Sequence, residues 1–134
     1  MPRPSAFTAP QLLGQLAALP QWRLHGDGPT LAIERIFTFD GYLATMAFAN
    51  AVAYLAERID HHPDMLLQYQ RCTVRWRTHQ PPGITVLDIE AALQVTACSA
   101  ATPARPEPLG HFTGSHRRAA RRSGSRQPWP PCLD

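Results

Sequence analysis

The chain has 134 residues, of which 44% are hydrophobic, and a formal net charge of +3, which fits one domain with a substantial core. Residues 1–102 contain seven arginines and eight acidic residues, whereas residues 103–134 contain six arginines and two acidic residues, so the main part of the chain offers no basic face for nucleic acid. Three widely spaced cysteines exclude a disulfide framework and a zinc knuckle, and no apolar run is long enough to span a membrane, so we expect a reduced, cytoplasmic protein.

The first half of the chain predicts a helix, a β-hairpin and a long helix. Residues 8–19 carry leucines at helical spacing after a candidate N-cap, Thr8. Two β-rich stretches, residues 22–24 and 31–37, flank a Gly26-Asp27-Gly28 turn and predict the hairpin. The long, Ala-rich helix is expected after Asp40 as N-cap and up to about Ile59, because Pro63 prevents much continuation.

The next stretch predicts two strands rather than one. Apolar side chains occupy odd positions up to Tyr69 and even positions from Cys72 onward. A single uninterrupted strand with this pattern would turn part of its core side to water. A tight turn or bulge is therefore expected near Gln70 and Arg71.

A last helix is expected after the Pro81-Pro82-Gly83 loop, with Thr85 as N-cap and Asp88 at the third helical position, as in a capping box. Its apolar pattern weakens after Val95. Residues 101–134 are rich in proline and arginine, so we expect a disordered tail outside a domain of residues 1–100. Arginine runs of this kind are more often solvated than bound to nucleic acid, and no nucleic-acid partner is expected.

Histidines and carboxylates concentrate in the second half of this domain. His61 and His62 are adjacent, His79 lies one strand later, and Glu57 and Asp88 flank the group. Imidazoles exchange protons near neutral pH, so the set is suited to acid/base chemistry. An isolated His-His pair after a helix is more often a C-terminal cap favoured by the helix dipole. No metal site is expected, because adjacent histidines diverge on most backbones and no cysteine lies at ligand spacing.

The spacing of these residues resembles the signature of the pterin-4a-carbinolamine dehydratases, and the resemblance extends from about residue 12 to residue 93. The matching positions are Glu57, His61-His62-Pro63, Tyr69, Thr78-His79 and Asp88. The resemblance implies an α+β domain of two layers, in which helices cover a four-stranded antiparallel sheet, and assembly into homodimers or homotetramers. It also implies that the chain removes water from a 4a-hydroxytetrahydropterin substrate to give the quinonoid dihydropterin, in tetrahydrobiopterin recycling and without a cofactor.

The same resemblance implies roles for the histidines. Loss of the 4a-hydroxyl needs an acid for the leaving oxygen and a base for the N5 proton. His61 and His79 are expected to be this pair, with the choice of acid and base open, and His62 is expected to hold the ring system. Glu57, one helical turn before His61, is expected to bond or orient an imidazole. Further supporting or substrate-binding residues are Asp60, Pro63, Thr78 and Asp88.

A non-catalytic dimerising or coactivator-type protein on the same scaffold is the alternative, because the apolar faces of the long helix would also suit an oligomer interface. The enzyme is favoured, since an interaction module has no need of three imidazoles. Tyr69 and Trp76 are expected to be core or interface aromatics. The chain departs from the family pattern at Pro82, which removes an amide donor beside the expected pocket.

Overall fold

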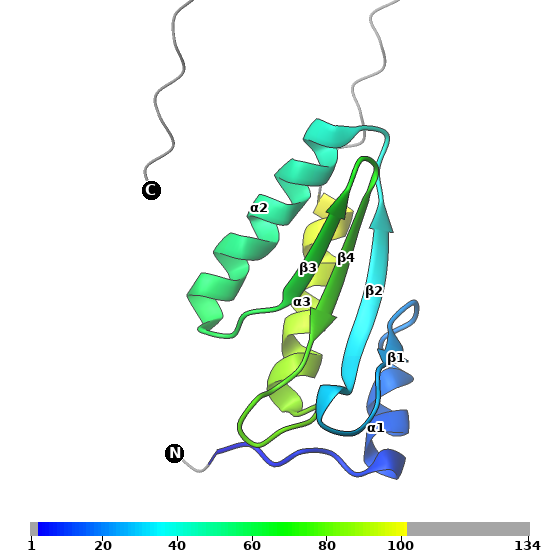
Figure 1. Ribbon diagram of the computed structural model, residues 1–134, viewed down its shortest axis with the longest axis vertical. Coiled ribbons are helices and arrows are strands. Elements are labelled where there is room, and N and C mark those ends of the chain that lie inside the picture. The colour runs from blue at the N-terminus through cyan, green and yellow to red at the C-terminus, as the bar shows by residue number, and fades with distance from the viewer. Residues whose placement is uncertain (1–2, 102–134) are drawn as a thin grey trace, which may run out of the picture.

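Local signals set the first elements of the protein, whose computed structural model describes residues 3–101 (Figure 1). Helix α1 (Ala9–Leu16) begins after Thr8, whose hydroxyl accepts a hydrogen bond from the Gln11 N–H while the Gln11 side chain accepts one from the Thr8 N–H. This capping box confirms the predicted N-cap, although the helix ends before residue 19. Strands β1 (Arg23–His25) and β2 (Ala32–Thr38) pair antiparallel around a 3-10 turn (Gly28–Thr30), so the predicted hairpin is confirmed.

The long helix α2 (Tyr42–Ile59) forms as predicted, but its N-cap is Gly41 rather than Asp40. The Phe39 N–H bonds to the Gln70 carbonyl, so β-type pairing continues past the end of β2 and the chain remains extended through Gly41. The prediction for Asp40 is therefore wrong by one residue. The helix ends at Asp60, which adopts the left-handed conformation (φ 51°, ψ 42°).

Strands β3 (Asp64–Gln68) and β4 (Arg71–Trp76) form the second antiparallel hairpin. Its turn lies at Tyr69 and Gln70, and the register places Leu67 opposite Cys72. The odd and even apolar positions therefore share one face, which confirms the predicted turn. The sheet order is β1-β2-β4-β3 with antiparallel neighbours, and the predicted α+β architecture is confirmed.

The core lies between this face of the sheet and the helices α2 and α3 (Figure 1). Its largest fully buried side chains are Trp76, Phe48, Leu19, Ile33 and Val52. Helix α3 (Val86–Ala101) continues past the point where the apolar pattern weakens, because Val95 is buried and Cys98 packs against the core. The predicted tail comprises residues 101–134, of which Ala101 is the last residue of α3 and the rest lie outside the described residues. No helix of the described part of the chain is long and apolar enough to cross a membrane.

The opposite face of the sheet carries a row of charges. Glu34 on β2 is only 3% exposed and bonds to Arg75 on β4 and Arg23 on β1. Burial acts to raise the pKa of Glu34, but Arg75, His25 and Arg23 together bring it below its usual value. The carboxylate of Glu34 is therefore ionised in the folded sheet.

Candidate active site

His61 is fixed at the point where α2 ends and the chain turns toward β3. The left-handed Asp60 terminates the helix, and the His61 N–H bonds to the Ala56 carbonyl. The side chain of His61 is 13% exposed. Its ring stacks on the indole of Trp76, with 5.2 Å between ring centroids and 21° between planes. Packing therefore leaves the imidazole little freedom to rotate.

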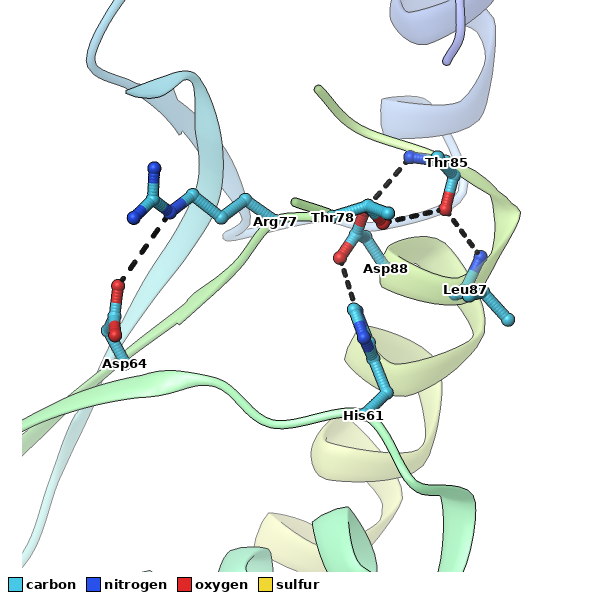
Figure 2. A network of polar contacts seen from close by, with 7 residues as sticks. All are labelled: His61, Asp64, Arg77, Thr78, Thr85, Leu87 and Asp88. Atoms are coloured by element: carbon cyan, nitrogen blue, oxygen red, sulfur yellow. Dashed lines mark hydrogen bonds and ion pairs between the residues drawn. The ribbon is translucent and has the colours of Figure 1, made fainter. Parts of the chain in front are cut away.

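Asp88 holds the same imidazole from the opposite element. This fully buried carboxylate lies at the start of α3, with its Oδ1 2.6 Å from His61 Nε2 (Figure 2). A carboxylate only accepts hydrogen bonds, so Nε2 carries a hydrogen and donates a hydrogen bond to Asp88. The other ring nitrogen, Nδ1, is therefore the one that does not bond to Asp88.

A chain of donors fixes Asp88 in turn. Its Oδ2 accepts hydrogen bonds from the Thr85 N–H at 2.9 Å and from the Thr78 hydroxyl at 2.8 Å (Figure 2). The Thr85 hydroxyl lies 2.9 Å from that of Thr78 and accepts a bond from the Leu87 N–H. Since Thr78 donates to Asp88, Thr85 donates to Thr78. The donors converge on one carboxylate, which they orient and stabilise.

His62 and Glu57 form a second imidazole–carboxylate pair, 2.7 Å from Nε2 to Oε1. Both side chains are more than half exposed, so solvent screens this pair and weakens it. The sequence pattern suggested that Glu57 bonds or orients an imidazole. That imidazole is His62, because the helix ends at Asp60 and His61 turns toward Asp88.

The third histidine lies on the loop that follows β4. Reciprocal backbone bonds between Thr78 and Gly83, of 2.8 and 3.1 Å, close this loop around His79. His79 is exposed, and its side chain makes no hydrogen bond or ion pair within residues 3–101. Asp60 is exposed at the helix terminus and Pro63 is half-buried. The structure thus brings together His61, Thr78 and Asp88 and, separately, Glu57 and His62.

Two residues of the site were not recognised from the sequence. Trp76 was expected to be a core or interface aromatic and is fully buried, but it also stacks on His61. Thr85 was expected only as a helix cap, yet it also orients Thr78 and Asp88. The alternating apolar pattern of β4 was the signal for Trp76, and the capping pattern formed with Asp88 was the signal for Thr85. Tyr69 is 67% exposed in its turn, so the core alternative is wrong for this residue.

The site is built from imidazole–carboxylate pairs rather than from a cluster of metal ligands. Within the described part of the chain, no group of three or more histidine, cysteine, aspartate or glutamate residues could hold a metal ion. His61 pairs with Asp88 on α3, and His62 pairs with Glu57 on the last turn of α2. Such pairs fix the orientation of a ring, as acid/base catalysis requires.

Comparisons with known proteins agree on one family. The sequence model of the family described as pterin 4 alpha carbinolamine dehydratase matches residues 5–98. A relative from Paracidovorax citrulli, provisionally named a pterin-4-alpha-carbinolamine dehydratase, is 42% identical over 97 residues, which are 72% of this chain and 84% of that protein. A relative from Stenotrophomonas maltophilia with the same provisional name is 41% identical over 88 residues, or 66% of this chain and 74% of that protein.

Solved structures also resemble this one. A transcriptional coactivator/pterin dehydratase from Brucella melitensis has a TM-score of 0.66 and 32% identity, and the match covers 71% of this chain and 99% of the other. A pterin dehydratase-like protein identified as a RuBisCO assembly factor of the alpha-carboxysome has a TM-score of 0.51 and 22% identity, over 59% of this chain and 89% of the other. The second likeness shows a shared fold only.

Proposed function

The chain belongs to the pterin 4 alpha carbinolamine dehydratase family, and we propose that it dehydrates a 4a-hydroxytetrahydropterin to the quinonoid dihydropterin, in the recycling of tetrahydrobiopterin. The observation that carries this proposal is the hydrogen bond between His61 and the buried Asp88. An oriented imidazole with one nitrogen bound to a carboxylate is the arrangement that a proton-transfer catalyst needs.

The reaction breaks the C4a–O bond and the N5–H bond and forms the C4a=N5 bond. One group protonates the departing hydroxyl, which leaves as water, and another accepts the N5 proton, so the enzyme is restored after proton exchange. His61 is assigned to one of these transfers through Nδ1, because Nε2 is bound to Asp88. A proton taken up at Nδ1 gives an imidazolium whose Nε2–H still donates to the carboxylate of Asp88.

His79 is assigned to the other proton transfer. Its side chain is exposed and lacks a hydrogen-bond partner among the described residues, so it is available to a bound ligand. The loop that carries it begins at Thr78, which is bonded to Asp88. The same carboxylate therefore orients His61 and anchors the loop of His79, which supports a common role. His62, paired with Glu57, is assigned to holding the pterin, and Asp60 and Pro63 to the backbone turn that presents both histidines.

The test is a stopped-flow assay of enzymatically generated 4a-carbinolamine. The wild-type protein should speed the loss of the carbinolamine absorbance. His61→Ala and His79→Ala should each lose much of this rate while the fold is kept, and the double variant should lose less than the product of the two effects. His25→Ala, a change on β1 outside the site, is the matched control and should retain the rate. A wild-type rate equal to that of buffer would end the enzyme assignment.

An interaction protein is the second candidate, because large apolar side chains of α2 are exposed. Leu43 and Tyr54 are 85% and 79% exposed, respectively. Such side chains are suited to a homodimer or homotetramer interface, or to a coactivator-type contact. Light scattering combined with the dehydratase assay separates the candidates: an oligomer without activity favours the interaction protein, whereas activity above the buffer rate establishes the enzyme.

A further inference from the structure

One edge of the sheet is only half covered. Strand β1 pairs with residues 32–34 of β2, in a register that places Arg23 opposite Glu34 and His25 opposite Ala32. Strand β2 continues to Thr38 beyond this pairing, and Figure 1 shows its upper part with no strand on the outer side. The other side of β2 is paired with β4 along residues 33–38.

The backbone groups of Ile36 and Thr38 point toward this open edge. The Phe39 N–H bonds to Gln70 on the β4 side. Hydrogen-bonded and non-hydrogen-bonded pairs alternate along antiparallel strands, so Phe37 also bonds toward β4 while Ile36 and Thr38 face outward. Neither outward residue makes a backbone hydrogen bond with a segment on the outer side within residues 3–101. Natural proteins usually cover or block such an edge.

The chain itself turns away where it could have covered the edge. Continuing the β1–β2 register by two residues would place Gln21 opposite Ile36. Gln21 instead has a left-handed backbone (φ 75°), which directs the preceding residues away from β2. A cavity of about 530 Å³ occupies this place, and its lining residues are Gln21, Arg35, Ile36, Phe37, Thr38, Phe39 and Ser99.

The cavity contains a cation without a matching anion. The guanidinium of Arg35 lies 4.3 Å from the ring centroid of Phe37, and one of its nitrogens donates to the Thr96 hydroxyl at 3.3 Å. Arg35 makes no ion pair with a carboxylate in the described part of the chain. Partial burial lowers the pKa of Arg35, but a guanidinium remains charged at neutral pH. An added carboxylate would offset the cost of this burial.

We propose that the open edge of β2 binds an extended peptide segment that carries a carboxylate side chain. The segment adds beside β2 and exchanges backbone hydrogen bonds with Ile36 and Thr38, while its carboxylate pairs with Arg35. A peptide fits better than a small carboxylate, because the two outward residues are spaced roughly 7 Å apart, the repeat of a strand. A small anion would satisfy Arg35 and leave the backbone groups unpaired.

The test is an NMR titration of the full chain, labelled with ¹⁵N, with the capped peptide acetyl-Thr-Val-Glu-Val-Thr-amide. We expect saturable shifts and slower hydrogen exchange at the amides of Ile36 and Thr38. Arg35→Gln should weaken binding about tenfold or more, because a charge-assisted bond is lost. Arg58→Gln is the matched control, since Arg58 lies on the exposed surface of α2, and it should bind as the wild type does.

A second variant tests the backbone contacts without removing the charge. Thr38→Pro deletes an outward N–H that makes no bond to β4, so it should weaken peptide binding while circular dichroism stays unchanged. A peptide with glutamine in place of glutamate should bind the wild-type protein about as weakly as the glutamate peptide binds Arg35→Gln. Equal binding of the glutamine peptide, or shifts elsewhere on the protein, would overturn the proposal.

Other occupants give distinct results that also contradict the proposal. A small carboxylate would be indicated if acetate alone shifted the amides of Ile36 and Thr38 as strongly as the peptide does. A second copy of the chain would be indicated if these amides shifted with protein concentration in the absence of peptide. These results are independent of the dehydratase assay, because the edge does not include the histidines.

Discussion

Replacing Asp88 with asparagine changes charge and proton position with little change in volume. The amide oxygen of the new side chain can accept from the Thr85 N–H and the Thr78 hydroxyl, which now meet at Oδ2. Its NH₂ group then faces His61 Nε2 in place of the acceptor now 2.6 Å away. The His61 ring must accept this bond, so its proton moves to Nδ1. The nitrogen assigned to proton transfer thereby loses its lone pair.

Two magnitudes follow from this geometry. The three hydrogen bonds that now end on an ionised carboxylate all become neutral ones, so the free energy of unfolding should fall by about 1–3 kcal/mol, and the fold should persist. The value of kcat should fall by roughly 10²-fold or more, the usual contribution of a general acid or base. Activity is therefore expected to fall much further than the small loss of stability explains.

The assay combines carbinolamine decay kinetics, urea unfolding and ¹⁵N NMR of the His61 ring. Glu90→Gln is the control, because Glu90 is exposed on the same helix and takes no part in the Asp88 network; its kcat should match the wild type. If Asp88→Asn kept the wild-type kcat, or if the His61 ring kept its proton on Nε2, the reasoning from the His61–Asp88 bond would be refuted.

Glu34→Gln should lower the free energy of unfolding by about 2 kcal/mol at pH 7, because the amide oxygen accepts from only one arginine, while the other arginine faces an NH₂ donor. The lowered pKa of Glu34 means that this stability is fully present above its ordinary value of 4.5 and is lost as the pH falls through the lower folded-state pKa. The unfolding free energies of the two proteins should therefore converge in acid, and a difference that stays constant as the pH falls would contradict this. Burial raises the pKa of Cys72 to about 11, so iodoacetamide at pH 8 should modify this thiol only after unfolding, and rapid native labelling detected by mass spectrometry would refute its burial. Trp76→Phe removes a buried indole N–H that has no hydrogen-bond partner in the described structure, and this gain offsets the loss of packing from the smaller ring. Chemical unfolding should therefore show a free energy of unfolding within about 1 kcal/mol of the wild-type value. A loss of about 3 kcal/mol or more would indicate that the indole N–H does have a partner.

The sequence by itself determined the order and most of the limits of the elements. Thr8 and Thr85 begin helices because their hydroxyls accept bonds from amides only two or three residues away, and such contacts need no distant partner. The change of apolar phase between Leu67 and Cys72 required a turn, since side chains alternate across any strand. The histidine spacing was likewise sufficient to indicate the family that the comparisons then showed.

The pairings within the site were decided by the tertiary structure. Asp88 lies 27 residues from His61, and their contact depends on the left-handed turn at Asp60 and on α3 packing beside α2. The sequence pattern suggested that Glu57 would bond an imidazole without deciding which one, and the folded chain pairs it with His62. The open edge of β2 was also invisible in the sequence, because it arises where Gln21 turns away from a register that the hydrophobic pattern allowed to continue. Local hydrogen bonds and alternation act over a few residues, while contacts between distant elements depend on the path of the whole chain.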